Sequence, residues 1–338
     1  MGLQLGDLVP RKAVEFKDLN GKVVAVDAFN AIYQFLSSIR QPDGTPLMDN
    51  NGKTTSHLSG LFYRNISLMA EGLKLVYVFD GEYHELKGKT HEKRKESRDK
   101  MAEGFKTALE EEDLEGMSKY ARSSERLDAE KVAESKELLE AMGIAVVEAP
   151  GEGEMQAAHL VNIGEAYAVG SQDYDAVAVG GKRLIQNLTL SRKRKLPGGS
   201  FVYISPEILE YEKVLGSLEL DRDQLICLAI LVGTDFNPGG VTGIGPKKAL
   251  TLVRTKKYPV AIFGELEEEG RLDFDWKEVF EIFKKPNVKD VKVSFPKLDE
   301  EKIKEILVEW PDFSEDRVYN QLEKLRGAKR KGDQQTLF

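Results

Sequence analysis

Short, apolar, β-branched runs recur along this chain and alternate with stretches of helical periodicity. The runs are KVVAVD near 22, LKLVYVFD near 73, IAVVEAP near 144, EAYAVGSQDYD near 165 and DAVAVG at 175. Their length and their flanking residues indicate buried strands. Helical spacing lies between them, in NAIYQFLSSI, SHLSGLFYRNISLMAEG and DAEKVAESKELLEAMG. The alternation predicts an α/β fold with a mostly parallel central sheet flanked by helices.

Two regions depart from this alternation. Residues 85 to about 125 are highly charged, favour helix and hold few large apolar side chains, so we expect an insertion that stands off the sheet. From about residue 219 the pattern becomes helical, with DQLICLAILVG, PKKALTLVR and the amphipathic SEDRVYNQLEKLRGAKRK, while KVSFPKLD is typical of a short extended piece. The length of 338 residues suits one large α/β domain with insertions.

The composition is that of a globular protein in water, with 41% hydrophobic and 31% charged residues. No apolar run approaches the roughly 18 residues that span a bilayer, so we expect no membrane contact. The start, MGLQLGDLVP, lacks the basic and apolar parts of a secretion signal, which predicts a cytoplasmic or nuclear protein. Cys227 is the only cysteine and lies in an apolar helical stretch, which favours a small buried side chain over a catalytic thiol.

The net charge of -8 argues at first against a nucleic-acid partner, because binding a polyanion requires Lys and Arg to neutralise phosphates. The distribution of charge matters more than the sum. The stretch KGKTHEKRKESRDK at 87–100 holds seven Lys or Arg against three Asp or Glu, and SRKRK at 191–195 has four cations in a row. Basic surface is therefore expected in patches, although each run alone also fits a solvated helix face or loop.

Acidic residues stand where the expected strands end. They end or follow the runs VVAVD, LVYVFD, VVEAP and AYAVGSQ and the apolar helix ILVGT. A strand-end Asp often caps the next helix, and that alternative holds for any single one of them. Ligand sites of open α/β sheets lie beyond the carboxyl ends of the strands, so the shared placement predicts one acidic site. Its members are Asp27, Asp80, Glu152, Glu154, Asp173, Asp175 and Asp235.

Such a cluster of carboxylates is typical of a metal site. Carboxylates in a dry site raise one another's pKa, so they need cations to remain ionised. With almost no Cys or His nearby, oxygen ligands select a hard ion, Mg²⁺ or Mn²⁺. Two such ions about 4 Å apart suit in-line displacement at phosphorus, which favours phosphodiester hydrolysis. Lys87 and Arg94, two turns apart on one helix face, are candidates to stabilise the developing negative charge.

The string GIGPKKA at 243–249 predicts a phosphate contact. Gly243 and Gly245 precede Pro246 at the first position of a helix, which leaves the N–H groups of the helix N-terminus available for an anion. Lys247 and Lys248 follow at once and favour phosphate, whereas the string alone also fits a plain tight turn. Such a loop holds the nucleic-acid backbone and reads no base sequence, so specificity is expected from DNA shape.

Together these residues resemble the archaeal flap endonuclease family, the group related to eukaryotic flap endonuclease and XPG-type nucleases. The resemblance covers essentially the whole chain and is carried by DAFNAIYQFLSSIRQPDGTPL, TSHLSGLFYR, VYVFDG, EAPGEGEMQAA, GSQDYD, RKRKLPG and LAILVGTDFNPGGVTGIGPKKAL. It implies a PIN-like nuclease core with a helical arch at about 85–125 and a helix-hairpin-helix (helix-three-turn-helix) element at about 225–255. These belong to a single nuclease domain, 1–330, with an N-terminal region of about 1–100, an internal region of about 125–260, a C-terminal helical part of about 260–330 and a tail at 331–338.

The resemblance implies a structure-specific 5′ flap endonuclease that hydrolyses DNA at the junction of single strand and duplex. It further implies 5′–3′ exonuclease activity, roles in Okazaki fragment processing and base excision repair, and two Mg²⁺ ions for which Mn²⁺ can substitute. The seven acids match the family's metal ligands, and Lys87 and Arg94 match the basic pair at the base of the arch. We accordingly expect a cytoplasmic monomer whose substrate is branched DNA with a 5′ flap.

Further residues gain roles only through the resemblance. Tyr33 matches the aromatic on which a terminal unpaired base stacks, where a core tyrosine is the alternative. Arg40 and Arg64 match residues that contact the DNA backbone, and Thr55 matches part of a pocket for a one-nucleotide 3′ flap. The hairpin loop of the family also binds K⁺ through main-chain carbonyls, which would put that ion near Gly240 and Val241.

The sequence departs from the family pattern at two places. After the Asp-Gly-Glu of residues 80–82, Tyr83 and His84 replace the usual pair of prolines, so we expect a less rigid entrance to the arch. The family ends in a motif for the sliding clamp PCNA, of which Gln334, Leu337 and Phe338 match the first part while the last aromatic is missing. Clamp binding is therefore expected of a chain with the complete motif rather than of this one.

Other functions fit parts of the sequence. A 5′ exonuclease or a Holliday-junction resolvase would share the same core, and Thr55 with the long arch segment favours flap cutting. The string from Asp173 to Val177 also fits a phosphoaspartyl phosphatase, which would have no use for GIGPKKA. A non-catalytic scaffold that binds DNA junctions would not need all seven acids, and none of them is replaced.

Overall fold

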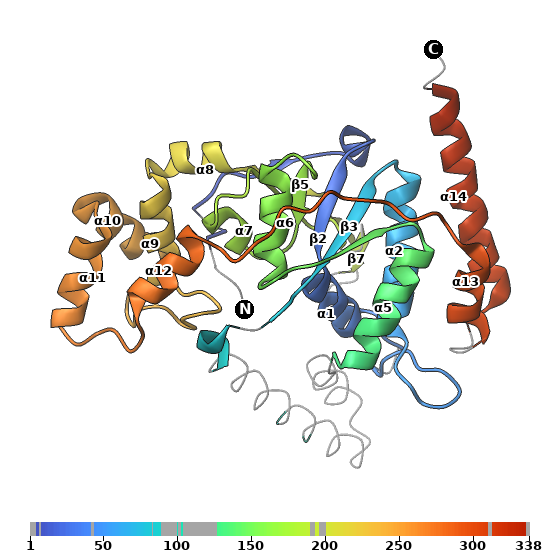
Figure 1. The fold of residues 1–338 in the computed structure, drawn as a ribbon, viewed down its shortest axis with the longest axis horizontal. Coiled ribbons are helices and arrows are strands. Elements are labelled where there is room, and N and C mark those ends of the chain that lie inside the picture. The colour runs from blue at the N-terminus through green and yellow to red at the C-terminus, as the bar shows by residue number, and fades with distance from the viewer. Residues whose placement is uncertain are drawn as a thin grey trace.

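The computed structural model of the chain confirms an α/β fold with a mostly parallel sheet and helices on both faces (Figure 1). The residues that the structure describes are 5–6, 8–41, 44–82, 84–88, 100, 103, 127–189, 193–195, 201–309 and 313–335. Most of the expected arch, with Arg94, lies outside the described residues, as do Leu337 and Phe338 of the expected clamp motif; Gln334 falls within the last helix.

Among the described residues, seven strands form the central sheet, in the order β1-β9-β6-β5-β2-β3-β4. The parallel strands are β2 (Val23–Asp27), β3 (Lys74–Phe79), β4 (Ala145–Glu148), β5 (Ala168–Gly170) and β6 (Arg183–Gln186). Two antiparallel strands close one side, β9 (Glu207–Glu210) and β1 (Lys12–Ala13). A separate antiparallel pair consists of β7 (Lys193–Lys195) and β8 (Phe201–Tyr203).

Alternate side chains of each central strand enter two different hydrophobic cores. In β3, Val76 and Val78 belong to one core, whereas Tyr77 and its neighbours Leu75 and Phe79 belong to the other. The first core is covered by α6 (Gly153–Asn162), α7 (Asp175–Ala178) and α9 (Arg222–Val232). The second is covered by α1 (Ala28–Ser38), α2 (Ser56–Ala70) and α5 (Ala129–Ala141) (Figure 1). Burial on both faces explains why the strands are continuously apolar in sequence.

DAVAVG at 175 is not the strand that its apolar run predicts. Asp175–Ala178 form helix α7, and the strand comes later, at Arg183–Gln186. Helix α7 ends in a tight turn in which the Gly181 N–H donates to the Ala176 carbonyl at 2.8 Å. The prediction was wrong because a run of four apolar residues fits a buried helical turn as well as a strand.

The remaining helices gather at opposite ends of the molecule (Figure 1). Around α9 lie α8 (Tyr211–Leu218), α10 (Pro246–Lys256), α11 (Pro259–Glu268) and α12 (Trp276–Lys284). Against α2 and α5 lie α13 (Glu300–Lys304), a π-helical turn (Glu305–Glu309) and α14 (Glu315–Gln335). No helix in the described part of the chain has the length and apolar character needed to cross a membrane.

The link between the two ends, residues 285–299, crosses the molecule without regular secondary structure (Figure 1). It contains KVSFPKLD, which forms no strand in this described segment. The buried side chain of Gln156 in α6 holds it: Nε2 donates to the Lys289 carbonyl at 2.8 Å and Oε1 accepts from the Lys289 N–H at 2.9 Å. The side-chain amide of Gln156 thus bonds both main-chain groups of Lys289, as the main chain of a neighbouring strand would do in a sheet.

Candidate functional site

The acidic residues meet at one edge of the sheet. Strands β5, β2, β3 and β4 are neighbours and parallel, so their carboxyl ends share that edge. Asp27 ends β2, Asp80 follows β3, and Glu152 precedes α6, which follows β4. Electrostatic interactions link every member of the set to at least one other. The structure therefore brings together Asp27, Asp80, Glu152, Glu154, Asp173, Asp175 and Asp235.

Backbone N–H groups in the first turns of three helices orient the carboxylates. Asp27 Oδ1 accepts from the N–H of Asn30 in α1 at 3.0 Å. Asp80 Oδ1 accepts from the N–H of Gly153, the first residue of α6, at 2.6 Å. Glu154 Oε1 accepts from the N–H of Ala176 in α7 at 3.0 Å. Because a helix N-terminus carries partial positive charge, these three helices also stabilise negative charge at the edge.

Two glycines allow the loops of the site to approach closely. The Gly81 N–H donates to the Gly151 carbonyl at 2.7 Å, and a Cβ on Gly81 would lie 2.0 Å from the Ala149 carbonyl oxygen. A Cβ on Gly153 would lie 2.8 Å from Asp80 Oδ1. Any side chain at either position would push apart the loops after β3 and β4, which carry Asp80 and Glu152.

Burial and mutual repulsion raise the pKa of the central carboxyls. Burial, followed by the charges of Asp80 and Asp173, raises the pKa of Asp27 to about 8. Burial and the neighbouring Asp235 and Asp173 raise the pKa of Asp175 to about 7, and burial with Glu152 raises that of Asp80 to about 6. The pKa of Glu154 is also well above its usual value, chiefly through burial. Burial is the largest cause of each shift, and repulsion between neighbouring carboxylates adds to it.

Lys87 is a cation that the described residues place within this cluster. Its ammonium pairs with Glu152, lies 3.8 Å from Asp235 Oδ2 and is 5.2 Å from the centre of the Phe236 ring. Burial lowers the pKa of Lys87, but Glu152, Asp235 and Asp80 together raise it above its usual value. The side chain is buried, so its charge acts inside the acidic site.

The residues just before Lys87 pack against the loop that follows α9. His84 packs edge to face against Phe236 with ring centres 5.9 Å apart. Its carbonyl accepts from the Lys87 N–H at 3.0 Å, and residues Glu85–Lys87 form a short 3-10 turn. His84 thus connects this turn to the loop that carries Asp235.

The donor set fits a hard divalent cation. All seven side chains offer carboxylate oxygens, and Asp175 Oδ1 is buried without a hydrogen-bond partner in the described part of the chain. Within that same part, no three acidic, His or Cys side chains converge closely enough to form a ready-made ligand set. The Lys87 ammonium pairs with Glu152 and Asp235 within this site.

The hairpin between α9 and α10 forms a second, exposed feature. Gly233 and Gly240 adopt positive φ (111° and 61°), and the Val241 N–H returns to the Leu231 carbonyl at 2.9 Å. Gly245 precedes α10 and Pro246 begins it, and no side chain caps the helix. Gly243 has a φ of 79°. Lys247 and Lys248 are exposed in the first turn, and Lys248 Nζ donates to the Gly243 carbonyl at 3.4 Å.

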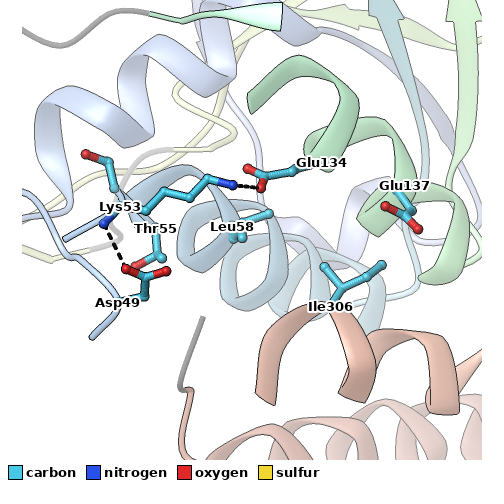
Figure 2. Close-up of a pocket in the computed structure, with 8 residues that line it drawn as sticks. Asp49, Lys53, Thr55, Leu58, Glu134, Glu137 and Ile306 are labelled. Carbon is cyan, nitrogen blue, oxygen red and sulfur yellow. Dashed lines mark hydrogen bonds and ion pairs between the residues drawn. The ribbon is translucent and has the colours of Figure 1, made fainter. Parts of the chain in front are cut away.

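A pocket lies at the other end of the molecule, where the loop before α2 faces α5 (Figure 2). Thr55 is buried at its wall, and Lys53 reaches across it to pair with Glu134. Lys53 also donates to Glu130 Oε1 at 2.9 Å. The lining residues are Asp49, Lys53, Thr54, Thr55, Leu58, Glu134, Glu137 and Ile306. The pocket therefore combines one lysine with carboxylates and a small apolar floor.

The other residues expected to contact DNA lie on or next to α1 and on α2. Tyr33 is 38% exposed on α1, so it is not a core tyrosine. The Arg40 guanidinium donates to the carbonyls of Ser37, Gly44 and Leu36, which anchors it at the end of α1. Arg64 is half-buried on α2, and burial lowers the pKa of its guanidinium.

One residue at the acidic edge was missed by sequence reasoning. The side chain of Asn30 donates from Nδ2 to Asp173 Oδ2 at 2.9 Å. Its position three residues after Asp27, on the first turn of the expected helix, was the available signal. That spacing predicts the backbone bond to Asp27, but not the contact with Asp173.

Known proteins are similar to this chain in sequence along its length. Family models match for the XPG N-terminal domain at residues 4–101 and for the XPG I-region at residues 143–235. Flap endonuclease 1 of Pyrococcus furiosus is 50% identical over 339 residues, covering 100% of this chain and 98% of that protein. Flap endonuclease 1 of Aeropyrum pernix is 48% identical over 331 residues, covering 96% and 94%.

Solved structures are similar as well. Flap endonuclease-1 from Methanococcus jannaschii has a TM-score of 0.77 at 40% identity, covering 98% of this chain and 100% of that one. The catalytic core of Rad2 in complex with DNA substrate has a TM-score of 0.66 at 22% identity, covering 91% and 95%, and shares the fold. Since half of its residues are identical to those of a flap endonuclease 1 along its whole length, this chain belongs to the flap endonuclease 1 family.

Proposed function

We propose that this chain is a structure-specific 5′ flap endonuclease that hydrolyses a DNA phosphodiester at the junction of single strand and duplex. The observation that carries the proposal is the placement of seven carboxylates at one edge of the sheet, where the pKa values of Asp27, Asp80, Glu154 and Asp175 are raised. Family membership supports DNA as the substrate, because the relatives are flap endonucleases. A cytoplasmic monomer acting in Okazaki fragment processing and base excision repair is consistent with that role, as is an associated 5′–3′ exonuclease activity.

The seven acids are proposed to hold two Mg²⁺ ions, with Mn²⁺ able to substitute. Once bound, these ions supply the electrophilic charge that in-line displacement at phosphorus requires. The chain's own part is to orient oxygens: helices α1, α6 and α7 bind one oxygen each of Asp27, Asp80 and Glu154. Lys87 is proposed to leave its carboxylate partners when cations enter and to contact the scissile phosphate, with Arg94 as second cation.

Duplex DNA is proposed to bind along the α9–α10 hairpin. Exposed Lys247 and Lys248 beside an uncapped helix start suit a phosphate, which such a site recognises without reading bases. A K⁺ ion near Gly240 and Val241 would add positive charge at the same loop. Arg40 and Arg64 are proposed to extend the backbone contact, and Tyr33 to stack on the unpaired base at the junction.

The pocket of Figure 2 is proposed to accept the single 3′ nucleotide of a double-flap substrate. Buried Thr55 would donate to the nucleotide, and the surrounding carboxylates would discourage entry of a longer, phosphate-rich strand. The clamp motif residues Gln334, Leu337 and Phe338 are proposed to bind PCNA only where a further aromatic follows.

The test is cleavage of a labelled double-flap duplex in Mg²⁺. We expect one cut, one nucleotide into the duplex, leaving a 5′-phosphate, and no cut in EDTA. A recessed 5′ end and a four-way junction of the same sequence serve as competing substrates. Faster cleavage of the recessed end would favour a 5′ exonuclease, and faster cleavage of the junction would favour a resolvase. Cleavage that persists in EDTA would contradict the two-metal proposal.

A further inference from the structure

Asn30 links two acids that belong to different strands. Asp27 ends β2 and Asp173 follows β5, the neighbouring strand. The backbone N–H of Asn30 donates to Asp27 Oδ1 at 3.0 Å, and its Nδ2 donates to Asp173 Oδ2 at 2.9 Å. The residue is half-buried in the first turn of α1, so the helix holds both donors in place.

We propose that Asn30 is a positioning residue that holds Asp173 in the orientation needed for cation binding. The proposal rests on the two-metal function proposed above. It concerns the side chain of Asn30, because the bond to Asp27 uses the main chain and any residue could make it.

Asp173 needs such a partner because of its surroundings. Its charge contributes to the raised pKa values of Asp27, Glu154 and Asp175, so three carboxylates repel it. The backbone of Asp173 is held by its N–H bond to Ser171 Oγ at 3.2 Å, which fixes the loop and not the carboxylate. The Asn30 amide holds the carboxylate itself.

An amide is suited to this task in a way that an ammonium is not. Lys87 also binds carboxylates of the site, but it brings a full positive charge that competes with a divalent cation. Asn30 donates one N–H and adds no charge, so the carboxylate keeps its full negative charge for the cation. Such outer hydrogen bonds orient metal ligands, and their loss commonly weakens metal binding about 10- to 100-fold.

The substitution Asn30→Leu isolates the side-chain contact. Leucine has nearly the shape of asparagine and favours helix, and the backbone N–H to Asp27 remains. We expect Mg²⁺ and Mn²⁺, titrated by calorimetry without DNA, to bind about 10-fold or more weakly than in the wild type. Asn30→Ala is the second variant if the leucine fails to fold.

Cleavage kinetics give a second readout. At low Mg²⁺ the variant should cut the double-flap substrate more slowly, and saturating Mg²⁺ should restore most of kcat. KM for DNA should be unchanged, since Asn30 acts through Asp173 and not on the substrate. Because Mg²⁺ also stabilises the folded protein, a melting curve at low Mg²⁺ must show that the variant is folded there, which separates a structural defect from weaker metal binding.

Asn162→Leu is the matched control. Asn162 lies at the far end of α6, where Nδ2 donates to the Gly180 carbonyl at 3.1 Å and Oδ1 accepts from the Lys182 N–H at 3.2 Å. It should lower thermal stability and leave Mg²⁺ affinity unchanged. Wild-type Mg²⁺ affinity in Asn30→Leu, or an equal loss in Asn162→Leu, would overturn the proposal. A wild-type protein that cuts flaps without binding Mg²⁺ would instead overturn the two-metal part of the proposed function, and one that binds Mg²⁺ but cuts no flap would overturn the flap activity.

Discussion

The acidic edge of the sheet and the α9–α10 hairpin are built in opposite ways. The edge takes buried and half-buried side chains from five separate stretches of the chain, one of which, with Asp235, begins the hairpin loop, and three helices hold its carboxylates with hydrogen bonds. The hairpin is one continuous stretch in which glycines shape the backbone and lysines stay exposed. At the edge, burial strengthens every charge; at the hairpin, water and salt screen them.

The difference corresponds to two roles, catalysis at the acidic edge and DNA binding at the hairpin. A site that must stabilise charge at one phosphate benefits from a dry, preorganised set of groups, even though the set repels itself without cations. A site that must follow a duplex without reading it benefits from exposed N–H groups and lysines. We therefore expect changes at the edge to alter the rate of cleavage and changes at the hairpin to alter DNA affinity.

Asp175→Asn should have the largest effect. It removes a buried carboxylate whose Oδ1 has no hydrogen-bond partner in the described residues, and several kcal/mol of transition-state stabilisation would lower kcat by about a thousandfold or more. DNA affinity, measured by fluorescence anisotropy in Ca²⁺, should stay within about threefold, a margin below 1 kcal/mol. Asp290→Asn, at an exposed acid paired with His159, is the control and should cut normally. Normal cleavage by Asp175→Asn would remove this carboxylate from the chemistry.

The thermal stability of the cation-free protein should depend on pH because of the carboxyls at the acidic edge. The raised pKa values of Asp27, Asp80 and Asp175, about 8, 6 and 7, mean that the folded state binds protons more tightly than the unfolded state. Stability should therefore rise as pH falls from above 8 toward 5, by several degrees in Tm. Mg²⁺ should raise Tm more at pH 8 than at pH 6, because protons compete with the cation.

Calorimetric melting with and without Mg²⁺ measures this effect. Asp175→Asn should flatten the pH dependence, since one of the raised carboxyls is gone. A double change of Lys247 and Lys248 to Ala should leave it as in the wild type, because both lysines are exposed in the first turn of α10 and neither pairs with a carboxyl of the edge in the described residues. A Tm that falls steadily between pH 8 and pH 6 would contradict the raised pKa values.

Changing Lys247 and Lys248 to Ala together should weaken DNA binding by about tenfold at moderate salt and lower the slope of log K against log salt by about 1.8. The loss of two phosphate contacts is the reason, and kcat at saturating DNA should be unchanged. The double change of Lys17 and Lys213, two exposed lysines elsewhere, is the control and should bind DNA normally. A fall in kcat with unchanged affinity would put the hairpin in the chemistry instead.

Thr55→Val should have the smallest effect. The change keeps the shape of the pocket wall and removes one hydroxyl, so it should cost about 1 kcal/mol, or about fivefold, in the preference for a double flap over a single flap. Cleavage of the single flap, which has no 3′ nucleotide, serves as the internal control. Equal loss on both substrates would assign Thr55 to the fold of the loop before α2.

The periodicity of the chain was enough to predict much of the fold. Apolar runs at β2, β3, β4 and β5 were long enough to identify strands, and helical spacing identified α1, α2, α5 and α9. DAVAVG failed because Asp175–Ala178 pack as a helical turn between β5 and β6. The bonds from Gln156 to Lys289 were beyond prediction, since nothing local marks residues 133 apart as partners.

The sequence by itself determined that acids follow parallel strands, and parallel strands place their carboxyl ends at one edge. It also determined the turn and the helix start of the hairpin, because the glycines, the proline and the lysines that form them are neighbours in sequence and turn geometry is local. Tertiary structure alone decided that Lys87 is buried among the acids, that His84 packs on Phe236, and that Asn30 reaches Asp173. The physical reason is that side-chain partners across strands depend on strand order and packing, which no local pattern contains.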